Sequence, residues 1–485
     1  MNLAEISKFR RWQLDGRSPV AKVDCGDWQR ANRVSRPSAK VRWMKEHRPR
    51  LVRLPTEPID RVMEPVSRFL HIEAASGVFL LLFTLLPLAL ANSPYADQFL
   101  AIWKTPISFS FGEFEMSHSL KHWINDGLMV IFFFVIGLEV KREIVLGELR
   151  DLRTAALPIA AALGGMIVPA GLYLMLQSSG PGQRGWGIPM ATDIAFVVGC
   201  LALLGSRVPH GLRILLLSLS IADDIGAILV IAVGYTSGIQ WTYLAWGIGG
   251  IGLVMLLARL GVRSVPVYAV LGLGIWYGFH ESGVHATIAG VILGVMTPVR
   301  PWVSDNLLSE FVGDLGGFME GENWQDIRER TASLRMLQRA ARETISPLER
   351  LEGMLHPWVS FVIMPLFALA NAGVPIRAES FAHPVALAVA IGLAVGKPLG
   401  IVVFSLLAVR SGLARLPQGV TWRVLAAGGI LAGIGFTMSL FIAELALSDG
   451  LLDAAKIGAL TGSAISSVIG MSLLWSLLPA PAQPH

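Results

Sequence analysis

The sequence is poor in charged residues and has almost no cysteine. Charged residues make up 15% of its 485 positions, whereas a soluble chain carries about 25%. The two cysteines, Cys25 and Cys200, are too few for a disulfide framework or a cysteine-based metal site. A P-loop is also missing, and residues 1–68 contain no apolar segment of the kind that a signal peptide needs. These absences exclude a secreted disulfide scaffold and give no support to a nucleotide-driven pump.

Hydrophobic residues, by contrast, make up 53% of the chain and gather in long blocks. A block of about 20 apolar residues is long enough to cross a bilayer as a helix. The blocks are apolar all round rather than along one face, which excludes the helical core of a soluble protein. We therefore predict an all-α polytopic membrane protein with about twelve transmembrane helices. The blocks are residues 73–92, 121–142, 155–177, 186–205, 211–235, 241–260, 265–279, 283–298, 355–376, 383–409, 422–447 and 454–478.

Basic residues lie in alternate connections between these blocks. Lys141 and Arg142 end the second block, Arg207 follows the fourth and Arg213 begins the fifth, whereas residues 236–240, after the fifth, contain none. Connections rich in Lys and Arg stay on the cytoplasmic side of a membrane. The pattern therefore predicts that both chain termini are cytoplasmic.

The chain divides into four parts by composition. Residues 1–62 are predicted to form a solvated, basic cytoplasmic extension, because they hold more Lys and Arg than Asp and Glu and no apolar block. Residues 63–299 would contain spans one to eight, and residues 300–354 a cytoplasmic connector. Residues 355–485 would contain spans nine to twelve and a short C-terminal tail.

The connector is predicted to contain an amphipathic helix at the membrane surface. Its basic residues lie on the other faces of the helix, and Ser346-Pro347 is predicted to begin the next helix, with Ser as the N-cap and Pro at the first helical position. The apolar face comprises Leu334, Leu337, Ala341 and Ile345.

Four charged residues stand deep inside the apolar blocks: Asp193, Asp223, Asp224 and Lys397. Each costs about 2.5–3.5 kcal/mol at the centre of a span, so together they cost roughly 10–14 kcal/mol if nothing compensates. Buried ion pairs that only hold helices together are one interpretation, but such pairs rarely add net stability. We favour the other interpretation, a pathway for ions or protons.

Two of the blocks are interrupted by Gly or Pro. Residues 185–193 read GWGIPMATD and residues 428–439 read GGILAGIGFTMS. A helix break exposes backbone groups, which a membrane tolerates only where they line a cavity. When the two halves are aligned on these breaks, the pair Asp223-Asp224 falls on Ser466-Ser467. Paired interruptions of this kind point to the binding site of a transporter built from inverted repeats.

Several motifs, taken together and in this order, resemble the NhaA family of bacterial Na⁺/H⁺ antiporters, which is itself a standard example of paired interruptions. The resemblance covers residues 64–478. The motifs are GLEVKRE (137–143), ATDIAF (191–196), ADDIGAI (222–228), SGVHATIAGV (282–291), HPWV (356–359), LFALANAGV (366–374), GKPLGI (396–401) and GIGFTMS (433–439). The resemblance implies a secondary transporter of the bacterial inner membrane that exchanges cytoplasmic Na⁺ or Li⁺ for external protons, is regulated by pH, and serves Na⁺ and pH homeostasis. It implies neither an enzyme nor a cofactor.

The resemblance also implies an architecture and roles for the buried charges. Spans three to five and ten to twelve would form an inverted repeat in which the broken spans four and eleven cross. Asp223 and Asp224 would hold the cation and exchange protons, while Asp193 and Lys397 would balance the charge of the exposed helix ends.

Regulation and partners follow from the same resemblance. The partners would be the lipid bilayer and the ions Na⁺, Li⁺ and H⁺, and not nucleic acid. The oligomeric state stays open, with a homodimer as one alternative. Candidates for pH sensing at the cytoplasmic end are Glu139, Glu143, His285 and His356, each of which has an interfacial ion pair or a hydrogen-bonded histidine as the alternative interpretation.

The chemistry of the residues agrees with ion exchange. Na⁺ and Li⁺ are hard cations and prefer oxygen ligands, as other hard cations do; Asp223, Asp224 and Thr192 supply such oxygens. Adjacent helical residues point about 100° apart, so the two carboxylates are not equivalent. We predict that Asp224 faces the cation and that Asp223 carries a proton beside Lys397. Two protons exchanged for one monovalent cation would move net charge.

Two other functions stay open at this point. An intramembrane aspartic protease could use Asp193 and Asp224, but the chain lacks a GxGD motif and the protease gives Lys397 no role. A passive cation channel built from the same helices is excluded by no motif.

Overall fold

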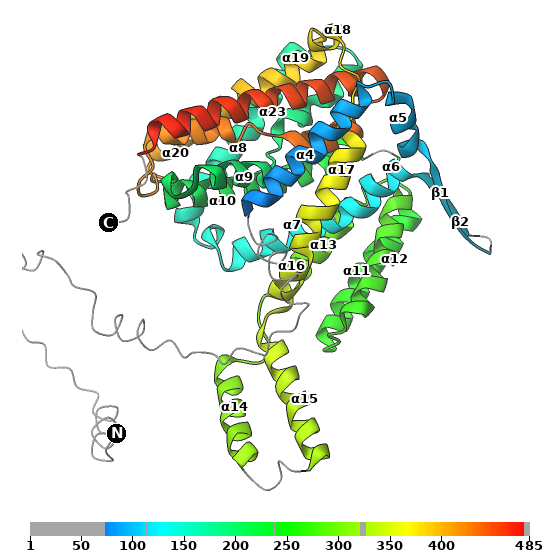
Figure 1. The fold of residues 1–485 in the computed structure, drawn as a ribbon, viewed down its shortest axis with the longest axis vertical. Helices are drawn as coiled ribbons and strands as arrows, with labels where there is room; N and C mark the ends of the chain where they lie inside the picture. The colour runs from blue at the N-terminus through cyan, green and yellow to red at the C-terminus, as the bar shows by residue number, and fades with distance from the viewer. Residues whose placement is uncertain (1–72, 113, 237, 321–325, 480–485) are drawn as a thin grey trace, which may run out of the picture. The chain divides into compact units, whose positions relative to one another are not determined.

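The computed structural model of the chain describes residues 73–112, 114–236, 238–320 and 326–479. The predicted basic extension, residues 1–62, lies outside them. Within the described ranges the chain is built from helices and one short two-stranded sheet (Figure 1). The prediction of an all-helical polytopic membrane protein is confirmed, with one small β-hairpin as an addition.

Each of the twelve predicted blocks contains at least one helix. In the first half the elements are α4 (Glu73–Ala91), α5 (Ala96–Lys104), β1 (Pro106–Phe111), β2 (Phe114–Ser119), α6 (Leu120–His122), η1 (Trp123–Leu128), α7 (Met129–Val145), η2 (Glu148–Arg150), α8 (Leu152–Leu176), η3 (Pro181–Met190), α9 (Ile194–Leu204), η4 (Gly205–Arg207), α10 (His210–Gly234), α11 (Trp241–Arg259), α12 (Val265–Ser282) and α13 (Thr287–Met296). In the second half they are α14 (Asp305–Glu320), α15 (Ile327–Thr344), α16 (Pro347–Trp358), η6 (Val359–Ile363), α17 (Met364–Asn371), α18 (Ala378–Phe381), α19 (Pro384–Ile391), η7 (Gly392–Gly396), α20 (Lys397–Arg410), α21 (Trp422–Leu431), α22 (Phe436–Ala446) and α23 (Asp449–Leu477).

Length and hydropathy distinguish the spans from the other helices. Among the described residues, seven helices are long and apolar enough to cross a membrane, or up to nine if each bent helix pair is one span. One of these pairs, α21 and α22, is bent by 50°. Helix α13 has only 10 residues, about half of what a bilayer crossing needs. The predicted spans that fall outside the count correspond to α7, α12 and α13, and α7 carries several charges at one end.

Glycines allow two helices of the bundle to approach closely. Helices α8 and α20 meet at Gly164 and Gly400, where a Cβ on Gly164 would lie 2.2 Å from the Gly400 carbonyl oxygen. A side chain at either position would push the helices apart, which is why small residues are favoured where membrane helices cross. Because Lys397 lies one turn before Gly400 on α20, this contact sets how deeply the lysine reaches into the bundle.

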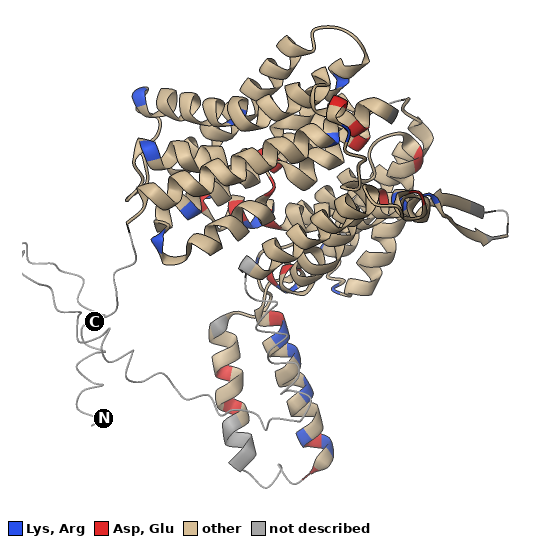
Figure 2. Ribbon diagram, turned by 45° about the horizontal axis from the view of Figure 1, so that its top comes forward, with Lys and Arg blue, Asp and Glu red and all other residues tan. Residues whose placement is uncertain are grey.

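The connector contains two helices, of which the sequence predicted one. Helices α14 and α15 lie side by side (Figure 1), and the ribbon coloured by charge shows both signs on them while most of the bundle is uncharged (Figure 2). Leu334 on α15 is 44% exposed, as an amphipathic surface helix requires. The predicted apolar face is too long by one residue, because α15 ends at Thr344 and Ile345 has an extended backbone.

The helix after the connector begins as predicted. Ser346 is the N-cap of α16, with Pro347 at the start of the helix. The Ser346 hydroxyl accepts a hydrogen bond from the Glu349 backbone N–H, and the Glu349 carboxylate accepts one from the Ser346 backbone N–H. This reciprocal arrangement satisfies two of the amide groups that a helix start leaves unpaired.

Candidate cation and proton site

Two broken spans meet in the middle of the bundle. Span four breaks between Met190, the last residue of η3, and Ile194, the first of α9. Span eleven breaks between α21 and α22. The two breaks are joined directly, since the Asp193 backbone N–H donates to the Ile434 carbonyl (2.7 Å) and the Ser439 hydroxyl donates to the Ile188 carbonyl (2.8 Å). Backbone groups that each break frees are thus partly paired by the other break.

Close approach explains the glycines of the second break. A Cβ on Gly433 would lie 2.5 Å from the Leu393 carbonyl oxygen, and a Cβ on Gly435 would lie 2.9 Å from the Ala191 carbonyl oxygen. Real Cβ atoms do not approach backbone oxygens so closely, so a residue with a side chain would force these segments apart. The motif GIGFTMS therefore has its glycines where the second break touches η7, in the case of Gly433, and the first break, in the case of Gly435.

Asp193 caps two helices at once. Its Oδ1 accepts a hydrogen bond from the Phe196 backbone N–H (3.1 Å), which makes Asp193 the N-cap of α9. Its Oδ2 accepts from both the backbone N–H (3.1 Å) and the hydroxyl of Thr437, in the first turn of α22. An anionic group at a helix N-terminus is stabilised by the unpaired amides and the helix dipole. This buried carboxylate therefore faces the positive ends of two helices.

Lys397 lies at the opposite kind of helix end. Its side chain is fully buried, and its ammonium donates a hydrogen bond to the carbonyl of Met190, at the C-terminal end of η3. The same nitrogen lies 2.8 Å from Oδ2 of Asp223. The lysine thus joins α20 to the first break and pairs with one of the two adjacent carboxylates.

The two adjacent carboxylates have different surroundings, although both are buried. Oδ2 of Asp223 is held by Lys397 and by the Thr192 hydroxyl, which lies 2.6 Å away. Oδ1 of each carboxylate is buried and has no hydrogen-bond partner among the described residues, but of the two carboxylates only Asp223 is also held by a lysine and a hydroxyl. A buried anionic oxygen without a partner is costly. The arrangement leaves Asp224 available for a cation or a proton.

Thr192 lies on the Asp223 side of the site. Its hydroxyl is within hydrogen-bond distance of Oδ2 of Asp223 and, at 3.1 Å, of the Ala432 carbonyl in the second break. It therefore links the first break, the second break and α10. The carboxylate of Asp224 is influenced by nearby charged residues instead. Asp223 and Glu139 repel the negative charge of Asp224, and Lys397 attracts it.

The second half of the chain uses a hydroxyl where the sequence alignment placed serines. Ser463 on α23 accepts hydrogen bonds from the backbone N–H groups of Gly435 (3.2 Å) and Phe436 (3.1 Å), at the start of α22. Ser466, which aligns with Asp223, is buried with an unpaired hydroxyl among the described residues. The equivalent position in this half thus carries no charge, and the two adjacent carboxylates of the site both come from α10.

The four candidates for pH sensing do not form one cluster. Glu143 accepts a hydrogen bond from Ser218 of α10 (3.0 Å). Glu139 and His356 are both within electrostatic reach of Glu352.

His285 lies apart from this group. It is within electrostatic reach of Asp126, which lies in η1, the helical segment that leads into α7. Asp126 and Glu139 are 13 residues apart along the helix, which corresponds to roughly 20 Å. The structure therefore separates His285 from the other three candidates.

Several polar partners were not found by reasoning from the sequence. Thr437 and Ser463 escape notice because single hydroxyl residues are common in spans. Glu444 of α22 is also new: it lies 2.6 Å from Lys121 and 2.5 Å from the buried Lys456. A glutamate near the end of a span, with lysines in two neighbouring spans, was the signal that could have found this group.

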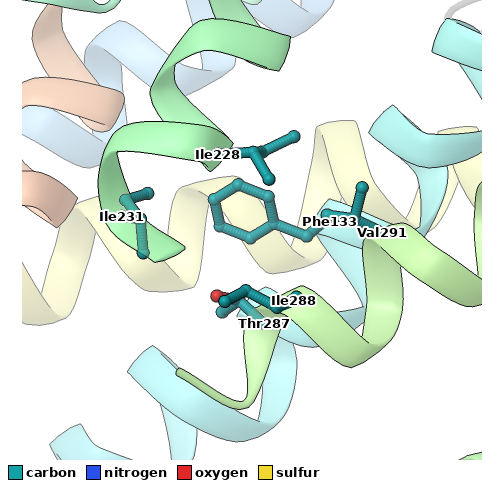
Figure 3. Close-up of a pocket in the computed structure, with 6 residues that line it drawn as sticks. All are labelled: Phe133, Ile228, Ile231, Thr287, Ile288 and Val291. Carbon is teal, nitrogen blue, oxygen red and sulfur yellow. The ribbon is translucent and has the colours of Figure 1, made fainter. Parts of the chain in front are cut away.

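A small apolar pocket beside the site has no ligands for a cation. It lies where α7, α10 and α13 meet, and Ile228 in its wall is one helical turn beyond Asp224 (Figure 3). Its lining residues are Phe133, Ile228, Ile231, Thr287, Ile288 and Val291. Thr287 is the one lining residue with a polar side chain, and a single hydroxyl is too little to hold a cation.

The sequence is similar to known proteins over nearly all of the described part. The model of a family described as Na⁺/H⁺ antiporter 1 matches residues 67–474. A Rhodopirellula baltica protein named Na⁺/H⁺ antiporter NhaA is 56% identical over 430 residues, which are 89% of this chain and 98% of the relative. A Rhizobium meliloti protein of the same name is 54% identical over 433 residues, 89% of this chain and 98% of the relative. A Vibrio vulnificus protein named Na⁺/H⁺ antiporter NhaA 2 is 48% identical over 424 residues, 87% and 95% of the two chains.

Proposed function

The chain belongs to the NhaA family of Na⁺/H⁺ antiporters and is a secondary transporter that exchanges Na⁺ for protons, and we propose that the exchange takes place at Asp223 and Asp224. The observation that carries the proposal is the buried, unpartnered Oδ1 of Asp224 beside an Asp223 that Lys397 already holds. A carboxylate in these surroundings gains from either a proton or a cation and has room for one of them at a time.

Competition for the same oxygens couples the two ions. When Na⁺ binds Asp224, the proton on that carboxyl must leave, because both occupy its lone pairs. Asp223 contributes a second proton when its bond to Lys397 opens, and it loses that proton when the ion pair re-forms. Thr192 supplies a neutral oxygen to the same group. Li⁺, which also prefers oxygen ligands, would compete with Na⁺ here.

A count of charges shows why this exchange is electrogenic in our proposal. With Na⁺ bound, two carboxylates, one ammonium and one Na⁺ sum to zero. With two protons bound instead, two neutral carboxyls and one ammonium sum to +1. Each turnover thus moves one net charge, and the membrane potential contributes about 2.3 kcal/mol per 100 mV to it.

Asp193 and Lys397 have a supporting role in this proposal. Asp193 faces the positive N-termini of α9 and α22, and Lys397 faces the carbonyl of Met190 at the negative end of η3. Without these charges the three helix ends would expose unpaired dipoles in the middle of the membrane. They keep the breaks open next to the carboxylates, so that backbone oxygens remain available to an ion.

Orientation and regulation complete the proposal. The basic connections favour cytoplasmic termini, with residues 1–62 and 300–354 on that side of the bacterial inner membrane. We assign the response to pH to Glu139, because it is in electrostatic reach of both Asp224 and Glu352. Its charge would link the cytoplasmic end of α7 to the exchange site.

The geometry gives an aspartic protease little support. Such an enzyme needs two carboxylates that share one water, but both oxygens of Asp193 accept hydrogen bonds from helix ends. The family of the chain is one of antiporters, but a passive channel would use the same oxygens. It differs from the antiporter in one measurable property, because a channel carries Na⁺ without an obligatory movement of protons.

The test is exchange in proteoliposomes with a fluorescent pH indicator. We expect Na⁺ to collapse an imposed pH gradient with the native chain and with Asp97→Asn, a control in which the exposed Asp97 of α5 loses its charge. Asp224→Asn should abolish exchange while inserting normally, because an amide neither releases a proton nor neutralises Na⁺. Normal exchange by Asp224→Asn would refute the site, and Na⁺ entry without proton movement would establish a channel.

A further inference from the structure

Three histidines from two separate parts of the chain converge beside the β-hairpin. His118 lies on β2, His122 ends α6, and His280 lies near the end of α12. One ring nitrogen from each lies within 4.8 Å of the corresponding nitrogens of the other two. The rings of His118 and His122 are stacked with centroids 4.2 Å apart, and the ring of His280 stands nearly perpendicular to that of His118, 5.3 Å away. Each ring therefore brings one nitrogen into the same small region.

A carboxylate completes the group. Oδ2 of Asp126 lies 3.5 Å from Nε2 of His122 and 3.6 Å from Nδ1 of His280, which are distances longer than an ordinary hydrogen bond. Nε2 of His122 is buried, and among the described residues it has no hydrogen-bond partner. Buried ring nitrogens are normally paired. A buried nitrogen without a hydrogen-bond partner, next to a carboxylate and two further imidazoles, is available to bind a metal ion.

The donor set fits a divalent transition-metal cation. Imidazole nitrogens suit Zn²⁺, Cu²⁺, Ni²⁺ and iron, and three histidines with one carboxylate supply the four ligands of a tetrahedral Zn²⁺ site. With Zn–N bonds of about 2.0–2.1 Å, ligand atoms in a tetrahedron lie about 3.4 Å apart. The side chains are half-buried rather than locked in the core, so ring rotations can bring the nitrogens into this range.

We propose that His118, His122, His280 and Asp126 bind one Zn²⁺ ion. This site is separate from the exchange site in chemistry, because Na⁺ prefers oxygen ligands and three of these four ligands are nitrogens. The ion would tie the β-hairpin to α12. A metal that binds only the folded arrangement stabilises that arrangement, so Zn²⁺ would restrain the hairpin against the α11–α12 pair.

The experiment uses the full-length chain, purified without a histidine tag and stripped of metal with a chelator. Zn²⁺ alone is titrated by equilibrium dialysis, and Co²⁺ is used in parallel because tetrahedral Co²⁺ has characteristic visible absorption bands. We expect one Zn²⁺ per chain and a tetrahedral Co²⁺ spectrum. We expect Zn²⁺ to raise the thermal unfolding midpoint of the protein.

The variant that removes the ligands is His118→Gln combined with His280→Gln. Its matched control is His210→Gln, which changes an exposed histidine at the start of α10. The double variant should lose at least 100-fold in Zn²⁺ affinity and the shift of the unfolding midpoint, and the control should keep both. The unfolding midpoint of the double variant in chelator, compared with that of the native chain, shows whether the double variant is folded.

Two results would overturn the proposal. The first is a native chain that binds no stoichiometric Zn²⁺ or gives no tetrahedral Co²⁺ bands, a result that does not depend on any variant. The second is a folded double variant that retains tight binding, since the metal would then be held by other histidines. Neither result depends on Na⁺/H⁺ exchange.

Discussion

The pair formed by Lys397 and Asp223 allows a quantitative test of how the buried charges are held. Their charged atoms are 2.8 Å apart, and both side chains are fully buried. At an effective dielectric constant of about 20, two opposite charges at this distance attract by about 6 kcal/mol. Part of this energy offsets their desolvation, and removing one partner of a buried pair costs about 3–5 kcal/mol. We expect Lys397→Met and Asp223→Asn each to lower the free energy of unfolding by about 3–5 kcal/mol.

The double variant decides whether the loss comes from the pair. When both charges are removed, neither member of the pair is left without its partner, so the cost should be well below the sum of the two single costs. The assay is denaturant unfolding in detergent at alkaline pH, where an unpaired carboxylate would carry its charge. We expect a coupling energy of about 3 kcal/mol or more. Lys397→Met combined with the exposed Asp97→Asn serves as a control and should be additive to within about 0.5 kcal/mol. Additive effects for Lys397 and Asp223 would refute the reasoning.

Three further predictions concern packing, capping and charge movement. Gly164→Ala would place a Cβ 2.2 Å from the Gly400 carbonyl oxygen and should lower the free energy of unfolding by about 1–3 kcal/mol. Its control is Gly171→Ala on the same helix, whose Cβ would meet no atom within 4 Å. Equal unfolding midpoints for the two variants would contradict the close contact. Thr437→Val removes a hydroxyl that donates to the buried Asp193 carboxylate and should cost about 1.5–3 kcal/mol in denaturant unfolding; an unchanged free energy would show that the hydroxyl does not support the charge. The initial rate of exchange in proteoliposomes should respond to a potassium–valinomycin potential, and a rate that ignores the potential would indicate one-for-one exchange.

Apolar blocks predicted the helices well because hydrophobic length is a local property. The block 211–235 corresponds to α10 and the block 422–447 to the bent pair α21 and α22. The β-hairpin was not predicted, although its strands, residues 106–111 and 114–119, alternate apolar and polar residues as half-buried strands do; hydrophobic length alone does not reveal such alternation. Helix α14 was missed for a similar reason, because its short apolar run resembles a connection.

The buried charges were found in the sequence because a charge in an apolar block is conspicuous. The pairing of Lys397 with Asp223 rather than with Asp224 was also predicted, from the angle between adjacent residues on a helix. Their other partners could not be predicted. Thr437 reaches Asp193 across 244 positions of the chain, and such contacts depend on how the two breaks cross. The histidines of the proposed Zn²⁺ site were overlooked because His280 is 158 positions from His122 and each is unremarkable alone.

The central claim is that Na⁺ and protons displace one another at Asp223 and Asp224, and proton release on Na⁺ binding tests it most directly. Na⁺ is added to the purified chain in weakly buffered detergent solution, and a pH indicator reports the protons released for each Na⁺ bound. The account predicts more than one proton released per Na⁺ by the native chain, the same release by Asp97→Asn, and none by Asp224→Asn. Na⁺ binding without proton release, or undiminished release by Asp224→Asn, would contradict it.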